Sequence, residues 1–573
     1  MQATPLTNNR IFIPKDFKLN TWEDLAPYYE QLLQKEINSA EELEQWLTNR
    51  SELDAYVSEN LGWRYIKMNI DTTNADFRDD FSFFINEIEP KIAPIDHQLN
   101  NKLHSNSFFA ILNQGDYKVY FRKLEQDIAI YREENIPLTT QLTQKAQQYG
   151  EIVGNMVVEV EGKTLTLQQA AVYLKKHDRN LRKEVYQKIA ERRLKDKERL
   201  NDLFSEMIAL RHQIALNAGF KNYRDYMFAA LGRFDYNPEA CFAFHEAIAK
   251  EVVPLVNEWD GQRKKQMQLE VLKPWDKNVD ALGREALHPV KSEEELIDKT
   301  IRCFNNIHPF FGECMQTMKN MKHIDLESKQ GKAPGGFNYP LYETGVPFIF
   351  MNSVGAANDV VTMLHEGGHA VHSFLTNPLK LTVFKDFPSE VAELASMSME
   401  LISMDFWGEF YPNKEALNRA KEEQLMSVLN KLPWIATIDK FQHLLYERPD
   451  HNHKEREQLW NLLMDKFSSD EVDWSENEEE KAHYWQKQLH LFEVPFYYIE
   501  YGMAQLGAIA VWKNYKENPQ KAIQQYMDAL KLGYTKSIPE IYQTAGIAFD
   551  FSQDYIKELV TFVQNELQKI TAH

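Results

Sequence analysis

The segment His365-Glu366-Gly367-Gly368-His369 has the residue types and the spacing of a catalytic metal site. Positions i and i+4 share one face of a helix, so the imidazoles of His365 and His369 can reach the same metal ion. Glu366 lies beside them, where its carboxylate can take a proton from a water molecule. This H-E-x-x-H pattern is typical of zinc sites that activate water for peptide hydrolysis. The alternative is a pair of hydrogen-bonded core histidines next to a solvent-facing Glu366.

The motif lies in a predicted helix that runs from Ala356 to Leu375. Apolar residues fall on most of its sides, so we expect the helix to be buried nearly all round. Asn358 or Asp359 can cap its start, and Asp359 could instead orient a ligand histidine. Gly367 and Gly368 each cost a helix about 1 kcal/mol relative to alanine. Such a paired loss predicts that another element packs closely against the backbone at this point.

A third metal ligand should come from outside this helix, because a catalytic zinc site usually takes three protein ligands. A second helix is predicted after Pro388, with Ser389 as its N-cap. Three carboxylates form one stripe along it: Glu390, Glu393 and Glu400. Burying them is costly without a positive partner, and the apolar filling of the helix argues against a solvated acidic face. The spacing alone does not choose between Glu390 and Glu393 as the ligand.

The segments HEGGHAVH and AELASMSMEL resemble the zinc oligopeptidases related to thimet oligopeptidase, and most closely their oligoendopeptidase F branch. The resemblance implies that Glu393 is the third zinc ligand and that Glu400, seven residues later, supports the ligands. His490 and the segment PFYYIEY resemble the C-terminal His/Tyr segment of that family. This implies that His490 and a tyrosine, Tyr497 or Tyr501, donate hydrogen bonds to the oxyanion. The matching segments span roughly residues 170 to 510.

A glycine-rich stretch from Gly331 to Asn352 resembles the loop and hairpin beside the family's active-site cleft. Its alternating FNYPLY and VPFIFMN segments also predict a hairpin. An extended peptide could add to the edge of this hairpin through main-chain hydrogen bonds. Gly335 and Gly336 would let that backbone approach closely. We therefore expect broad tolerance of substrate side chains.

The resemblance implies a mainly α fold, in the form of a large two-lobed ellipsoid with a deep substrate channel and a small β-hairpin or sheet beside the zinc site. It further implies a zinc oligoendopeptidase of the gluzincin type, with one Zn²⁺ per chain, that cleaves internal bonds of short unstructured peptides. His365, His369 and Glu393 would hold the metal, and Glu366 would be the general base for a metal-activated water. A dipeptidyl carboxypeptidase is the alternative enzyme. A silent zinc-bearing scaffold that binds peptides is disfavoured by Glu366.

Composition limits the partners and the compartment. The 573 residues include 85 acidic and 65 basic ones, a net charge of −20, which disfavours a nucleic-acid partner. The three cysteines, Cys241, Cys303 and Cys314, lack a metal-binding spacing and cannot all pair, so we expect reduced, buried thiols. The chain shows no secretory signal, membrane span or lipidation motif, which favours a cytoplasmic protein with no membrane partner. The oligomeric state stays open.

Most of the chain is predicted to be helical, without repeats or low-complexity linkers. Residues Pro238 to Trp275 are expected to form one long helix. The domain boundary is soft. We place an N-terminal helical lobe at residues 1–170 and a catalytic zinc-peptidase lobe at residues 171–573.

Overall fold

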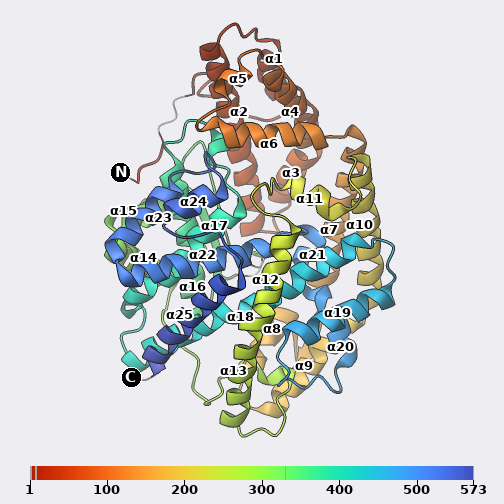
Figure 1. Cartoon of the computed structure of the whole chain (residues 1–573), viewed down its shortest axis with the longest axis vertical. Helices are drawn as coiled ribbons and strands as arrows, with labels where there is room; N and C mark the ends of the chain where they lie inside the picture. The colour runs from red at the N-terminus through yellow and green to blue at the C-terminus, as the bar shows by residue number, and fades with distance from the viewer. Residues whose placement is uncertain (1–2, 7–9, 330, 334, 572–573) are drawn as a thin grey trace.

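The computed structural model describes residues 3–6, 10–329, 331–333 and 335–571 of the chain. Its backbone is mainly helical and contains two small sheets, so the predicted fold class is confirmed (Figure 1). Within the described residues, no helix is both long enough and apolar enough to cross a bilayer.

The N-terminal helices lie together at one end of the molecule, at the top of Figure 1. They are α1 (Trp22–Gln34), α2 (Ala40–Ile70), α3 (Ala75–Phe83), α4 (Glu89–His104), α5 (Phe109–Leu112) and α6 (Tyr117–Ile130). Their apolar faces form a core of their own, which also takes in Leu381 and Phe384 from the segment after the helix that carries the H-E-x-x-H motif. The two-lobe division at residue 170 stays a prediction.

A second group of helices surrounds the small sheet formed by β1 (Val157–Val160) and β2 (Lys163–Thr166) and connects the N-terminal helices to the rest of the chain. Its members are α7 (Ile136–Gly154), α8 (Leu167–Ala171), α9 (Arg179–Leu194), α10 (Lys197–Asn217), α11 (Tyr223–Ala230), α12 (Pro238–Glu251) and α13 (Val253–Gln266). Helices α12 and α13 replace the single long helix predicted from Pro238 to Trp275, so that prediction was wrong. Pro254 has no N–H for the helical bond to Lys250, and its ring crowds that carbonyl, which breaks the helix at Val252.

The predicted hairpin is part of a three-stranded sheet. Strand β5 (Phe348–Ser353) is central, with β4 (Phe337–Tyr339) antiparallel on one side and β3 (Ile324–Glu327) parallel on the other. Phe337 pairs with Phe350 and Tyr339 with Phe348. The β4–β5 hairpin is thus confirmed, and β4 is an edge strand of this sheet. Pro334, inside the glycine-rich loop, lies outside the described residues.

The largest core joins the helices around the sheet and the C-terminal half of the chain. These helices are α14 (Glu293–Ile307), α15 (Pro309–Met321), α16 (Ala357–Thr376), α17 (Ser389–Ser403), α18 (Lys414–Glu447), α19 (His453–Phe467), α20 (Glu478–His483), α21 (Leu489–Glu493), α22 (Tyr498–Glu517), α23 (Pro519–Leu530), α24 (Ile538–Thr544) and α25 (Gln553–Thr571). Helix α17 packs between α16 and α22. Residues on these three helices therefore meet in one place.

Candidate active site

Helix α16 carries the H-E-x-x-H motif and packs closely against α17 at Gly368 and against Phe304 of α14 at Gly367. A Cβ on Gly368 would come within 2.7 Å of Ser396 Cα, and one on Gly367 within 2.6 Å of the Phe304 ring. Both distances are shorter than real Cβ contacts allow. The close approach predicted from the glycine pair is therefore present, and it brings the motif directly onto α17.

Asp359 caps the start of α16. Its Oδ2 accepts hydrogen bonds from Val354 N at 2.7 Å, Ala356 N at 3.0 Å and Ser353 Oγ at 3.0 Å. No hydrogen bond among the described residues joins Asp359 to His365 or His369. Of the two roles considered for Asp359, this geometry favours capping over the orientation of a ligand histidine. The N-cap residue itself is Ala356, and Asp359 caps the helix from the third helical position.

Three candidate metal donors converge between α16 and α17. The donor atoms of His365, His369 and Glu393 all lie within 4.8 Å of one another. His365 Nε2 is 3.4 Å from Glu393 Oε2, and His369 Nε2 is 3.9 Å from the same oxygen. Glu390 turns away and accepts a hydrogen bond from Tyr236 Oη at 2.6 Å. The geometry therefore favours Glu393 where the spacing left the choice open.

The chemistry of this donor set fits a zinc ion, since two imidazole nitrogens and one carboxylate oxygen are ordinary zinc ligands. Burial would raise the pKa of Glu393, but the hydrogen bond to His365 and the charge of His369 hold this pKa at about 2. Burial lowers the pKa of His369 to about 4. At neutral pH, Glu393 is therefore an anion and His369 a neutral imidazole, as ligands must be.

Glu400 fixes the orientation of the His365 ring by binding its Nδ1. Its Oε1 lies 2.7 Å from His365 Nδ1, and its Oε2 accepts a bond from Gln424 Nε2 at 2.7 Å. Although burial opposes it, the bonds to Glu393 and Glu400 raise the pKa of His365 well above its ordinary value. A metal ligand must be neutral, and because a carboxylate only accepts, the remaining proton of a metal-bound His365 would reside on Nδ1 and leave the lone pair of Nε2 for the metal. Carboxylate–histidine pairs of this kind orient metal ligands and raise their basicity.

Glu366 lies beside the donors with 6% of its surface exposed. Burial raises the pKa of Glu366 to about 7. A charge on His365 lowers this pKa, whereas the nearby carboxylates of Glu393 and Glu400 raise it further. Its backbone carbonyl accepts a hydrogen bond from Asn338 Nδ2 at 3.2 Å, which ties edge strand β4 to the motif. A carboxylate with such a pKa can exchange a proton near neutral pH.

The predicted His/Tyr segment faces the same site. Tyr497 Oη donates to Glu393 Oε1 at 3.4 Å. The Tyr497 and Tyr501 rings lie 5.2 Å apart, and each lies about 6 Å from the His490 ring, at 6.1 and 6.0 Å. The structure thus brings His490 and both tyrosines together beside the metal donors.

Two residues that the sequence did not single out determine which His490 nitrogen carries the proton. Trp434 Nε1 donates to Gln488 Oε1 at 3.0 Å, and this leaves the amide nitrogen of Gln488 2.7 Å from His490 Nδ1. An amide nitrogen only donates, so Nδ1 accepts and the proton of the neutral ring resides on Nε2. Burial lowers the pKa of His490 to about 4, so the ring is neutral at pH 7. His490 Nε2–H is therefore a hydrogen-bond donor.

Arg233 holds the turn that leads into Tyr497, a role that no sequence pattern indicates. Phe496 is fully buried with φ of +68°, a left-handed conformation that is uncommon for a non-glycine residue. Arg233 Nη2 donates to the Phe496 carbonyl and to Glu500 Oε1, the latter at 2.8 Å. The Phe496 N–H donates to Gln442 Oε1 at 2.7 Å. Both backbone groups of the strained residue are thus bound by buried side chains.

Space for a ligand exists next to these groups. A cavity of about 580 Å³ is lined by Tyr497 and Pro495 on one side and by residues of α7 and α11, including Thr143 and Met227, on the other. On the far side of the motif, Gly335 has φ of +95°, and a Cβ on Gly336 would lie 3.2 Å from Phe350 O. Both glycines border β4, the strand along which the substrate backbone is expected to bind.

Comparison with known proteins gives family matches along most of the chain. Residues 172–561 match the family described as Peptidase family M3, and residues 12–131 match the Peptidase M3 N-terminal domain.

Individual relatives agree with the family match. The chain is 24% identical over 339 residues to Oligopeptidase PepF of Bacillus subtilis, which covers 58% of this chain and 49% of that protein. It is 22% identical over 388 residues to an Oligoendopeptidase F homolog of Borreliella burgdorferi, covering 66% and 63%. The matched regions thus span about half to two thirds of these relatives. The solved structure of PZ peptidase A with inhibitor 2 superimposes with a TM-score of 0.90 at 26% identity, over 98% of this chain and 99% of that one.

Proposed function

Because this chain belongs to peptidase family M3 and its relatives support the oligoendopeptidase F branch, we propose that it is a zinc-dependent endopeptidase of short unstructured peptides. One observation carries the proposal. The donor atoms of His365, His369 and Glu393 converge within 4.8 Å, and the buried carboxylate of Glu366 lies beside them. A purely structural metal site has no use for such a carboxylate.

His365, His369 and Glu393 would hold one Zn²⁺, which when bound supplies a Lewis acid and lowers the pKa of a coordinated water. The protein side of the chemistry begins with Glu366. Its carboxylate takes a proton from the attacking water and later delivers it to the leaving amine. The raised pKa of Glu366 suits both transfers, because the group is then neither too weak a base nor too weak an acid near neutral pH.

Negative charge develops on the carbonyl oxygen as the water attacks, and it needs hydrogen-bond donors. His490 Nε2–H and a tyrosine hydroxyl, Tyr497 or Tyr501, are the proposed donors. Their rings cluster within about 6 Å of each other at the site. Preorganised donors of this kind contribute about 10²- to 10³-fold to the rate.

The substrate backbone would pair with the free edge of β4, beside Gly335 and Gly336. Asn338 of β4 is bonded to the carbonyl of Glu366, so a peptide on this strand would pass close to the general base. Main-chain pairing does not read side chains, which supports broad substrate tolerance. The buried, unpaired Cys241, Cys303 and Cys314 fit a reducing compartment, so we also propose a cytoplasmic location.

The deciding experiment is mass spectrometry of products from a ladder of unstructured peptides of increasing length. Wild type and Glu366→Gln are compared, each with its zinc content measured. We expect internal cuts by wild type that fade for long substrates, and a loss of activity with zinc retained in Glu366→Gln. Successive dipeptide release from the C-terminus would replace the endopeptidase by a dipeptidyl carboxypeptidase. No cleavage by fully zinc-loaded wild type would leave a peptide-binding scaffold.

A further inference from the structure

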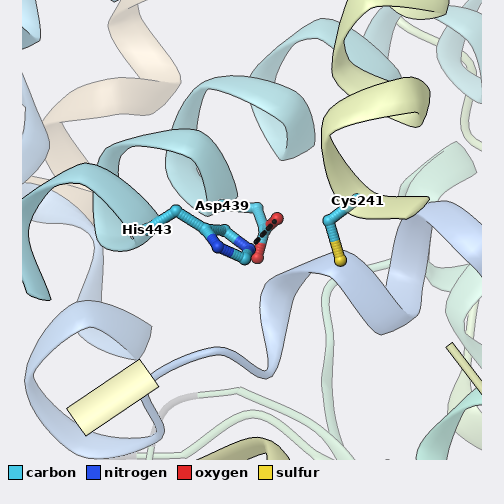
Figure 2. A group of neighbouring side chains, drawn as sticks. All are labelled: Cys241, Asp439 and His443. Atoms are coloured by element: carbon cyan, nitrogen blue, oxygen red, sulfur yellow. Dashed lines mark ion pairs between the residues drawn. The ribbon is translucent and has the colours of Figure 1, made fainter. Parts of the chain in front are cut away.

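A second group of metal-ligand residues lies away from the active site, between α12 and α18 (Figure 2). Cys241 and His245 are i and i+4 on α12, and Asp439 and His443 are i and i+4 on α18. Each pair therefore shares one helix face, and the two helices pack against each other. All four side chains have 0% of their surface exposed.

The donor atoms of this group are as close together as those of the active site. One donor atom each from Cys241, Asp439 and His443 lies within 4.8 Å of the other two. His443 Nε2 is 3.2 Å from Asp439 Oδ2, and His245 Nε2 is 2.8 Å from the same oxygen. Figure 2 shows the Cys241 sulfur and the His443 ring on either side of the Asp439 carboxylate.

Several polar atoms of the group have no hydrogen-bond partner among the described residues. They include His443 Nδ1 and Asp439 Oδ1, while the contact between His443 Nε2 and Asp439 Oδ2 lacks the geometry of a hydrogen bond. The rings of Phe242 and Phe496 lie 4.9 and 5.4 Å from the His443 ring, so its surroundings are apolar. An unsatisfied buried polar group costs about 1–3 kcal/mol. A cation between these atoms would give the nitrogen, the sulfur and the oxygen a common partner.

We propose that Cys241, Asp439 and His443 bind a second divalent cation of the zinc type, which braces α12 against α18. Thiolate and imidazole donors select zinc over the harder cations magnesium and calcium. Binding would release the Cys241 proton, so the thiolate and the carboxylate would together neutralise the two positive charges. His245 would donate to the ligand carboxylate of Asp439, as residues behind metal ligands commonly do.

The alternative source of positive charge for Asp439 is a protonated histidine. A protonated histidine would pair with the carboxylate alone and would leave the Cys241 sulfur without a role in the group. The metal accounts for the sulfur, the carboxylate and the imidazole at once.

The full burial of the group indicates a structural rather than a catalytic site, because a catalytic metal needs an open position. Its neighbours suggest what it supports. Gln442, adjacent to His443, binds the Phe496 N–H, and the His443 ring packs on Phe496. Bracing α18 here would steady the turn that precedes Tyr497.

Cobalt titration of the full-length, metal-free protein tests the proposal. The active-site donors contain no sulfur, so a sulfur-to-cobalt charge-transfer band in the near ultraviolet can report only a cysteine site. We expect two equivalents of Co²⁺ per chain in wild type, with the band from one of them. Cys241→Ser should remove the band and that equivalent, whereas Cys314→Ser, at an equally buried cysteine outside both donor groups, should keep them.

The test does not depend on the proposed peptidase activity. His369→Ala should remove the active-site equivalent and leave the sulfur band intact. A wild type that saturates without a sulfur band would overturn the inference, as would a band that persists in Cys241→Ser. If Cys241→Ser does not fold, the wild-type titration and Asp439→Asn, which should weaken the band-forming equivalent at least tenfold, decide the question.

Discussion

Glu400 Oε1 lies 2.7 Å from Nδ1 of His365, so a hydrogen bond joins α17 to the candidate zinc ligand on α16. The anionic carboxylate sets the tautomer of His365 and makes its Nε2 a better donor to a cation. The second oxygen of Glu400 is bound by Gln424, which keeps the carboxylate in this position.

Glu400→Gln keeps the shape of the side chain and removes its charge. We expect zinc affinity to fall about 10- to 100-fold, as it does when carboxylates behind metal ligands are neutralised. Competition with a chelator of known affinity measures the change. Glu480→Gln is the matched control, because Glu480 is equally buried but bonds Asn477 and not a zinc ligand. Equal zinc affinity in wild type and Glu400→Gln would contradict the assignment.

Gln488→Met removes the amide that donates to His490 Nδ1 and nearly preserves the volume of the side chain. The proton of neutral His490 is then no longer fixed on Nε2, so we expect kcat to fall about tenfold with little change in KM. Gln486→Met is the control, because the buried Gln486 amide donates to Lys197 O instead. A fall confined to KM would indicate that Gln488 acts on substrate binding and not through His490.

The lowered pKa of His490 predicts a pH-dependent stability. In the unfolded chain His490 takes up a proton near its ordinary pKa of 6.5, whereas in the folded protein it does so only at about 4. The unfolded state binds more protons between these values, so the free energy of unfolding falls as the pH decreases through this window. His490→Gln removes this contribution. Wild type should lose about 1–2 kcal/mol relative to the variant between pH 7.5 and pH 5.

Urea unfolding of both proteins at the two pH values measures this difference, since the other histidines are common to both. A stability gap that does not change with pH would show that His490 titrates normally in the folded protein.

Arg233→Lys keeps a buried positive charge, but the shorter lysine side chain would not place its nitrogen at the position of Nη2, which donates both to Glu500 and to the Phe496 carbonyl. The left-handed turn at Phe496 should relax, and Tyr497 should move away from Glu393. We expect kcat to fall about tenfold while the zinc content stays at the wild-type level. Arg224→Lys, at an ion pair with Asp225 and Glu447, should leave kcat unchanged. Loss of zinc in Arg233→Lys would place the defect at the metal ligands instead.

These residues show where sequence reasoning succeeds and where it stops. The i and i+4 spacing of His365 and His369 and the glycine pair between them specify local helix geometry, so the motif and its close packing were predictable. The choice of Glu393 as the third ligand required either the family resemblance or the structure. Glu390 lies on the same stripe of α17, and the spacing does not show which of the two faces the histidines.

Arg233 and Gln488 were not predictable, since neither belongs to a local pattern. Arg233 acts on residues more than 260 positions away. Gln488 lies two residues before His490, but its amide is oriented by Trp434, 54 positions earlier. The grouping of Cys241, Asp439 and His443 was not predictable for the same reason, because these residues come from two helices that meet only in the folded chain. The break between α12 and α13 is predictable from Pro254, because proline seldom fits inside a helix.

Gly335→Ala tests whether the peptide backbone binds along β4. Gly335 has φ of +95°, which an alanine adopts at a cost of about 1–2 kcal/mol, although no described residue beyond its chain neighbours lies within 4 Å of the added Cβ. The strained loop should shift β4, so we expect KM to rise several-fold with zinc content unchanged. Gly283→Ala is the control, because Gly283 also has a positive φ and open space but does not border β4.

A proline scan through a good substrate tests the same pairing from the other side. Alternate residues of a strand point their N–H groups toward the neighbouring strand, and proline has no N–H to donate. Cleavage should therefore be lost at every second proline position and retained between them. Uniform tolerance of proline, together with an unchanged KM in Gly335→Ala, would show that the substrate is held by its side chains and that the β4 edge is not its binding site.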